Sequence, residues 1–307
     1  MRYFFVFISI LITYYTKAQL IVNNSTHNLQ SETYFNPKYL KVNQIEKITG
    51  KVSFKKSLQP ITEAGNIVQF VFDREGRLIE KIESFDVSYF QKDTASLVYK
   101  YNDINQLVAI SNNQRRGFDA TLYNYDSAGN VEKKVFARGK NLSQFKYQLE
   151  KGKQFFVKEE IQKTEKQSEF FELTTIFNNE GAPYIKIETE FDSLCNIASK
   201  TSRYVVTNKK HIINYKYNQE GKLQEIDEYS NVAGISKTYF TYSYDDLGNI
   251  YEELKYKNDT LVQRRQFLYE DVSSLLVAEL IKNEKTNEIK IIQFEYQFFD
   301  SVTKVDP

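Results

Sequence analysis

The chain has 307 residues and a mass of 36.2 kDa, which is enough for one large β domain or two average ones. Its 41 Lys and Arg residues balance 40 Asp and Glu residues, so the formal net charge is +1. This balance excludes binding to nucleic acid or anionic lipid through a general electrostatic attraction. A hydrophobic content of 41% with a mean hydropathy of −0.53 excludes a polytopic helical membrane protein.

Residues 1–18 have the pattern of a secretory signal peptide. Met1 and Arg2 are followed by an apolar run over residues 3–15, and Ala18 is a small residue at the expected cleavage point. The run is shorter than the ~18–20 residues that span a bilayer, so we predict cleavage and no integral membrane span afterwards. The protein is therefore expected to be exported, to the periplasm, the cell surface or the medium. The single cysteine, Cys195, excludes an internal disulfide.

Residues 19–60 form an N-terminal segment that we expect to be partly extended or to hold a short helix. Residues 61–307 form a repeat domain. Its repeated phrase is aromatic-x-aromatic-Asp/Asn, then two variable residues, Gly, a polar residue, and Leu, Ile or Val. The clearest copies start at Phe70, Tyr123, Tyr215 and Tyr242.

The phrase predicts a β-hairpin turn. The Asp or Asn side chain can bond the backbone that follows it, and a residue at positive φ closes the turn with a bulge. The predicted turn residues are Asp73, Gly76, Asn105, Asp126, Gly129, Gly181, Gly221, Asp245 and Gly248. Asn is the most tolerant replacement for Gly, whereas Cys195, at another glycine position, predicts a strained, shifted or different turn.

The spacing of the turns predicts an all-β antiparallel meander of repeated hairpins with roughly 16–18 strands. Open sheets rarely exceed ~10 strands, so this sheet must curve. A spiral meander, a split sheet and a closed barrel are all compatible with the pattern. We predict a large curved or spiralling sheet.

The clearest copies, residues 123–131 and 242–250, resemble the YD repeat of Rhs (rearrangement-hotspot) and teneurin-type proteins. That resemblance implies a YD-repeat-like exported shell without catalytic activity. The chain departs from the family in holding fewer repeats, and we expect neither a toxin domain nor a self-cleavage region after the last strand.

Side chains that catalyse reactions or bind metals are scarce. The sequence holds 2 His, 1 Cys and no Trp beside 23 Tyr and 23 Phe. We predict no structural zinc, no cofactor and no enzymatic activity. His211 is interpreted as a sheet residue, and the acids Asp126, Asp245 and Asp246 as turn residues rather than calcium ligands. Two glutamates converging in one cleft would instead indicate a hydrolase.

The sequence favours a non-enzymatic β-repeat scaffold at the cell envelope that binds an unknown protein or glycan and no nucleic acid. One alternative is a carbohydrate-binding module with an aromatic surface, although alternating Tyr and Phe in strands are more often explained by cross-strand packing, and the absence of Trp weakens this alternative. Its candidate residues are Tyr123, Tyr125, Tyr215, Tyr217, Tyr242 and Tyr244. Another alternative is an outer-membrane β-barrel, which is disfavoured because Lys and Glu occupy both alternating faces, as in residues 252–255.

Overall fold

The computed structural model describes residues 19–26, 34–88, 91–114, 117–145 and 148–300. The predicted signal peptide, residues 1–18, lies outside these ranges. Within them the chain forms one short helix and eighteen strands. All eighteen strands belong to a single antiparallel sheet.

The elements follow one another with short connections. They are α1 (Pro37–Val42), β1 (Ile45–Lys55), β2 (Thr62–Phe72), β3 (Leu78–Ser88), β4 (Gln91–Tyr101), β5 (Leu107–Gln114), β6 (Gly117–Tyr125), β7 (Val131–Asn141), β8 (Lys151–Ser168), β9 (Phe171–Phe177), β10 (Pro183–Phe191), β11 (Ile197–Tyr204), β12 (Lys210–Tyr217), β13 (Leu223–Ser230), β14 (Ser236–Tyr244), β15 (Ile250–Lys257), β16 (Thr260–Tyr269), β17 (Leu276–Asn283) and β18 (Ile289–Phe298).

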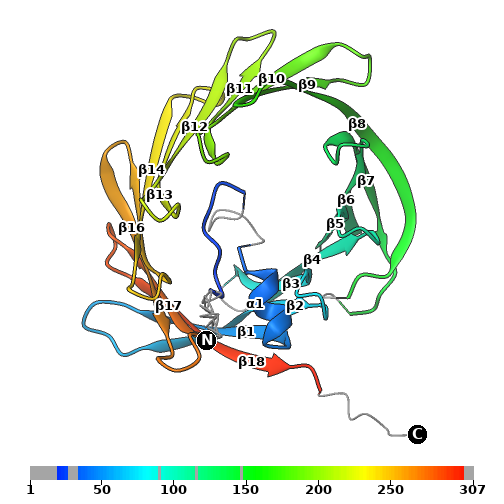
Figure 1. The fold of residues 1–307 in the computed structure, drawn as a ribbon. Coiled ribbons are helices and arrows are strands. Elements are labelled where there is room, and N and C mark those ends of the chain that lie inside the picture. The colour runs from blue at the N-terminus through cyan, green and yellow to red at the C-terminus, as the bar shows by residue number, and fades with distance from the viewer. Residues whose placement is uncertain (1–18, 27–33, 89–90, 115–116, 146–147, 301–307) are drawn as a thin grey trace, which may run out of the picture.

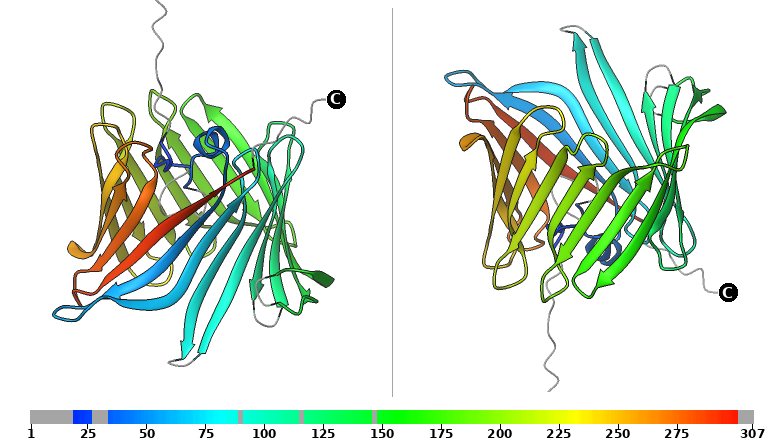
Figure 2. Two further views of the ribbon diagram at one scale, coloured as in Figure 1. Left: turned by 90° about the horizontal axis from the view of Figure 1, so that it is seen from below. Right: turned by 90° about the horizontal axis from the view of Figure 1, so that it is seen from above.

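The sheet closes on itself into a barrel (Figures 1 and 2). Each strand pairs with the next, and β1 also pairs with β18, so that Gly50 lies opposite both Val68 on β2 and Phe294 on β18. The antiparallel meander is confirmed, and the predicted curved or spiralling sheet is corrected, because the curved sheet closes into a barrel. Closure gives the backbone groups of β1 and β18 partners that an open sheet would leave exposed at two edges.

The repeated phrase builds the same turn seven times. At Asp126 one carboxylate oxygen accepts the backbone N–H groups of Ala128 at 2.9 Å and Asn130 at 2.8 Å. Asp73, Asn102, Asn178, Asp192, Asn218 and Asp245 make the equivalent pair of bonds. The strand pairing shifts by one residue beside the turn, as at Asn124/Tyr125. This is the bulge that a residue at positive φ produces.

The glycine position of these turns is left-handed. Gly76, Gly129, Gly181, Gly221 and Gly248 have φ values of 77°, 86°, 78°, 74° and 83°. Asn105 takes its place at φ 66°, and Cys195 at φ 61°. The turn at Cys195 is therefore neither shifted nor different from the others. Because its Cβ is held at positive φ, that turn carries the strain that glycine avoids.

The N-terminal segment folds inside the ring of strands (Figure 1). An isolated bridge joins Ile21 to Phe35, and the helix α1 begins after Asn36, whose side chain accepts the N–H groups of residues 38 and 39. We call residues 19–26 and 34–43 the plug. The expected N-terminal segment, 19–60, also contains β1, so the barrel starts before residue 61.

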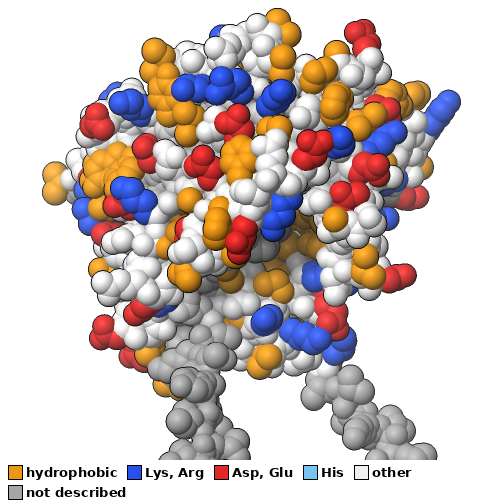
Figure 3. All heavy atoms as spheres, turned by 45° about the horizontal axis from the view of Figure 1, so that its top comes forward, with side chains coloured by type: hydrophobic (Ala, Val, Ile, Leu, Met, Phe, Trp, Pro, Cys, Tyr) orange, Lys and Arg blue, Asp and Glu red, His pale blue; other side chains and the backbone are white. Residues whose placement is uncertain are grey.

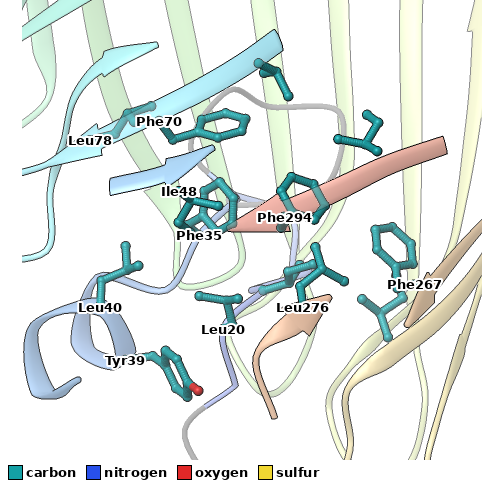
Figure 4. Packing of buried hydrophobic residues seen from close by; sticks show 14 of the residues in the cluster. Leu20, Phe35, Tyr39, Leu40, Ile48, Phe70, Leu78, Phe267, Leu276 and Phe294 are labelled. Atoms are coloured by element: carbon teal, nitrogen blue, oxygen red, sulfur yellow. The ribbon is translucent and has the colours of Figure 1, made fainter. Parts of the chain in front are cut away.

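The hydrophobic core lies between the plug and one part of the wall (Figure 4). Leu20 and Leu40 are 0% and 1% exposed, and the ring of Phe35 lies 4.9 Å from Phe70 and 5.5 Å from Phe72. Within the described residues, the wall side chains of this core come from β1–β5 and β12–β18. The wall from β6 to β11 contributes none of them, so the core is one-sided.

The two faces of the barrel differ in chemistry. Apolar side chains of the core point inward, whereas the outer face carries ion pairs. Examples are Lys216–Glu225 at 2.7 Å across β12 and β13 and Arg264–Glu252 at 2.6 Å across β16 and β15. Figure 3 shows Lys and Arg side chains interspersed with Asp and Glu on the side that faces the viewer. The outer wall therefore mixes charged pairs with exposed apolar side chains such as Ile67, Ile161 and Leu268, and the inner wall is apolar where it meets the plug.

Candidate ligand-binding site

The tyrosines predicted as an aromatic surface face the lumen instead of solvent. Tyr242 is 4% exposed, and Tyr215, Tyr217 and Tyr244 pack against the hydrophobic core. Tyr123 and Tyr125 lie on the inner face of β6, because Thr121 on the same face is opposite the core residue Ile110. The alternative that placed these six residues on an outer surface is corrected, since their side chains lie on the inner face of the barrel.

A shared hydrogen bond accounts for five tyrosines at or near the ends of strands, four of which directly precede a repeat turn. In each case the hydroxyl donates to the backbone carbonyl of the first strand residue after the preceding hairpin turn at the same end of the barrel. The bonds are Tyr101 to Leu78 at 3.0 Å, Tyr125 to Leu107 at 2.6 Å, Tyr217 to Ile197 at 2.8 Å, Tyr244 to Leu223 at 2.5 Å and Tyr296 to Leu276 at 2.7 Å. Each such tyrosine joins neighbouring hairpins, which explains why its side chain turns inward.

The plug is fixed to the same end of the barrel as these turns. Asn23 donates its side-chain N–H to the hydroxyl of Tyr244 at 2.9 Å, and the Tyr39 hydroxyl donates to the carbonyl of Ser273 at 2.8 Å. The Pro37 carbonyl lies so close to Gly76 that an added Cβ would be 2.1 Å from its oxygen. The turns therefore form a seat for the plug that leaves no room for a side chain at Gly76.

A pocket of about 430 Å³ remains between the plug and the wall at this end. Its apolar lining comes from the plug and from β2, β3, β4 and β5. The lining includes Phe35, Pro37, Phe72, Leu78, Tyr101 and Leu107, with Glu75, Arg77 and Asn105 as its polar members. An apolar cavity of this size with a few placed polar groups is the usual form of a small-molecule site.

The polar side of the pocket is rigid. Arg77 donates from Nε to Asp73 at 2.7 Å and from Nη1 to the side-chain oxygen of Asn105 at 2.6 Å. Its guanidinium carbon also lies 4.9 Å from the ring centre of Tyr101. Burial, followed by the Asp73 charge, raises the pKa of Tyr101 to about 12, so its hydroxyl stays protonated. A ligand would meet a preformed polar edge, which lowers the entropy lost on binding.

Two buried carboxylates lie on the inner wall, but they form no cleft. Glu253 on β15 and Glu279 on β17 are each 2% exposed, and Arg265 on β16 pairs with Glu279. Burial raises the pKa of Glu253. The plug covers the group, because the Tyr34 ring lies 6.0 Å from the Arg265 guanidinium carbon. This arrangement holds the plug electrostatically and offers a sugar chain no access, unlike the converging pair expected of a hydrolase.

A second aromatic group, which the sequence pattern did not single out, lies on the outer wall. Tyr229, Tyr239 and Tyr256 surround a depression of about 350 Å³ on β13–β15, together with charged and amide side chains such as Asp227 and Lys237. The rings of Tyr239 and Tyr256 are 5.8 Å apart. These tyrosines lie on the outer face of the sheet, so packing in the hydrophobic core does not explain why aromatic residues occupy these positions.

Within the described residues, no group of three His, Cys, Asp or Glu side chains could hold a metal ion. No helix in that part of the chain is both long enough and apolar enough to cross a membrane. The predicted sheet residue His211 lies on the inner face of β12, where its Nε2 is 2.7 Å from Glu228.

No protein-family model matches the chain, and no curated protein matches it. Among solved structures, it resembles a porin-like protein from Bacteroides uniformis with 10% identity and a TM-score of 0.39, covering 82% of this chain and 98% of that one. A porin-like protein from Bacteroides vulgatus has 11% identity and a TM-score of 0.30, covering 70% of this chain and 97% of that one. The Tc holotoxin pore of Photorhabdus luminescens has 11% identity and a TM-score of 0.31, covering 75% of this chain and 12% of that one. At such low identities and TM-scores, nothing about this chain follows from those proteins.

Proposed function

We propose that this protein is an exported, water-soluble binding barrel of the cell envelope, without enzymatic activity, that holds an apolar small molecule between its plug and its wall. The observation that carries the proposal is the apolar pocket of about 430 Å³ beside Phe35 and Leu107. Its preformed polar edge at Arg77 supports the proposal further. The earlier expectation of a binding scaffold becomes specific in this form, since the bound molecule lies inside the barrel.

The charged pairs on the outer wall support the water-soluble form over the outer-membrane alternative. The sheet is closed into a barrel, as that alternative requires. A barrel in lipid also needs a continuous apolar band on its outer face. Here charged pairs such as Arg264–Glu252 and Lys216–Glu225 lie on that face. Each Lys or Arg at the bilayer midplane would cost ~2–4 kcal/mol. Mature protein that needs detergent to stay in solution would overturn this part of the proposal.

The binding test introduces one tryptophan at a time into a sequence that contains none. Leu107→Trp places an indole in the pocket and should block the neutral dye phenylnaphthylamine, which wild type is expected to bind with enhanced fluorescence. Leu194→Trp is the matched control, because Leu194 is 74% exposed on a distant turn. Equal dye binding by wild type and both variants would show that the pocket is not the site.

The outer tyrosines support a second function, carbohydrate binding. Tyrosine rings offer flat apolar faces with polar edges, and the adjoining Asp227 and Lys237 supply hydrogen-bonding groups for hydroxyls. A glycan array with wild type and Tyr239→Ala tests it, with Tyr242→Phe in the lumen as a control. Binding that survives Tyr239→Ala, or no binding at all, would remove this function.

A further inference from the structure

One strand of the closed barrel keeps a free edge. β8 pairs with β7 from Lys151 to Ile161, but it pairs with β9 only from Ile161 onward. The β9–β10 turn marks the end of the covered part, where the side-chain oxygen of Asn179 accepts the backbone N–H of Glu159 at 3.0 Å. Among the residues that the structure describes, no strand adjoins residues 153–158 on the side away from β7 (Figure 1). We call residues 153–158 the β8 edge.

The β8 edge exposes apolar side chains as well as backbone. Phe155, Phe156 and Val157 are 55%, 61% and 55% exposed. Leu142, which is 58% exposed, lies against Gly152 just before the edge and extends the apolar surface. Single exposed apolar residues are common, but consecutive ones on an unpaired strand form a template for pairing with another chain. The features of this edge are therefore those of an interaction surface.

A protein strand suits this edge better than a lipid surface does. In an antiparallel pair, alternate residues direct their N–H and C=O groups away from the partner strand, so part of the β8 edge directs these groups away from β7. Hydrocarbon offers such groups no hydrogen-bond partner, and burying them without one is unfavourable. Another strand bonds to them and covers the side chains of Phe155 and Phe156 at the same time.

The two ends of the β8 edge carry opposite charges. Lys153 stands at the start, and Glu180 lies near the other end, in the β9–β10 turn that contacts Glu159. Both side chains are exposed, and within the described ranges neither forms an ion pair. Lys158 is already paired with Glu160 at 2.7 Å, so it does not neutralise Glu180. The edge thus has a free positive charge at one end and a free negative charge at the other.

A second copy of the chain matches this pattern. A two-fold axis near Phe156 sets two β8 edges side by side in antiparallel orientation, with Lys153 of each copy towards Glu180 of the other. The β9–β10 turn ends where the free edge begins, so each strand fits into the space that the other copy's short β9 leaves open. Such a pair uses both edges, so it closes as a dimer and does not grow further.

We propose that the β8 edge is a dimerisation surface, at which two copies of this chain join β8 to β8 as antiparallel strands. Backbone hydrogen bonds hold the two strands, the exposed phenylalanines cover each other, and the pairs between Lys153 and Glu180 fix the orientation. This inference is independent of the proposed ligand, because the pocket is lined by the plug and by β2–β5 rather than by β8.

The test follows the mass of the protein without its predicted signal peptide by sedimentation equilibrium over a range of concentrations. Wild type should form a dimer, and Phe156→Lys should be a monomer, because two lysines would meet near the axis. Leu268→Lys is the matched control, since Leu268 is also an exposed apolar strand residue but lies on β16, which is paired on both sides. Amide hydrogen exchange across residues 153–158 should be slower in the dimer than in Phe156→Lys, because pairing protects the outward N–H groups.

A charge exchange tests the orientation of the two strands. Lys153→Glu and Glu180→Lys should each weaken dimerisation about tenfold, because each places like charges at two symmetric contacts. The double variant should dimerise like wild type again, since the pairs are restored with their signs exchanged. A partner of any other kind would not respond in this way.

A wild type that stays monomeric at every concentration would overturn the inference, as would a dimer that Phe156→Lys leaves intact. Failure of the double variant to recover would also overturn it, because the strands would then not be antiparallel. A monomer that binds vesicles of phosphatidylethanolamine and phosphatidylglycerol, and loses that binding in Phe156→Lys, would assign the edge to a membrane surface instead.

Discussion

The contact between the plug and the turn at Gly76 can be measured with two alanine substitutions in the same kind of turn. Gly76 and Gly221 have nearly equal φ values, 77° and 74°. A Cβ at Gly221 meets nothing within 4 Å, whereas one at Gly76 would lie 2.1 Å from the Pro37 carbonyl oxygen. Gly221→Ala therefore measures the cost of the backbone conformation alone, and Gly76→Ala adds the cost of displacing the plug.

The magnitudes follow from the geometry. A non-glycine residue in the left-handed region costs about 1–2 kcal/mol, which is the expected loss for Gly221→Ala. At Gly76 the carbonyl must also retreat from 2.1 Å to about 3.4 Å, the start of ordinary contact. That shift moves α1, whose Leu40 is 1% exposed, and partial loss of one such burial adds about 2 kcal/mol or more. The expected total for Gly76→Ala is roughly 3–5 kcal/mol.

Urea unfolding of the two variants and wild type, followed by circular dichroism and tyrosine fluorescence, gives both free energies of unfolding. The m-values should remain similar if only the native state changes. An equal loss of stability in Gly76→Ala and Gly221→Ala would refute the reasoning, because it would mean that the plug is not held against the turn.

Three further predictions concern single side chains. Cys195→Gly should raise the free energy of unfolding by about 1 kcal/mol, since glycine removes the strain at φ 61°; an unchanged urea midpoint would contradict this. Tyr125→Phe should lower it by ~1 kcal/mol through loss of the bond to Leu107, whereas Tyr251→Phe, which changes a 45% exposed side chain, should have no effect. Because burial raises the pKa of Glu253, the folded state binds this proton more tightly than the unfolded chain, so this group's contribution to stability falls as pH rises through the folded-state pKa. Glu253→Gln should therefore stabilise the protein near pH 7.5 and lose that advantage near pH 4, and a pH-independent difference would count against a buried carboxylate.

Local chemistry made the turns predictable. An Asp or Asn side chain that accepts two backbone N–H groups, followed by a residue at positive φ, needs only five consecutive residues to form. For this reason Asn105 could be assigned a left-handed conformation from sequence. The number of strands follows from the spacing of such turns, and the observed eighteen lies at the upper end of the expected range.

Closure of the barrel and the position of the plug depend on contacts between distant residues. Gly50 on β1 meets Phe294 on β18, and no sequence pattern connects these two residues. The two faces were also hard to separate by alternation, because inner positions include charged residues such as Lys81, Glu253 and Lys255. These residues lie opposite Tyr242, Phe70 or Phe240 on the same face, so polar and aromatic side chains mix there.

The binding residues divide in the same way. The tyrosines were found because they belong to the repeat, but the bond from the hydroxyl of Tyr217 to the Ile197 carbonyl at the start of the neighbouring strand β11 was not predicted. The pocket combines Phe35 of the plug with Leu107 of β5, which sequence patterns do not connect.

The seam between β1 and β18 also determines when the protein can finish folding. Ile48 pairs with Tyr296 across nearly the whole length of the sheet's sequence, so this contact has the greatest loop-closure entropy of the barrel. Every other pairing joins consecutive strands and can form as synthesis proceeds, because its contact order is low. Until β18 is available, the nascent sheet presents the free edge of β1 to other chains. Vectorial synthesis therefore makes the last strand the one that ends the period of greatest aggregation risk.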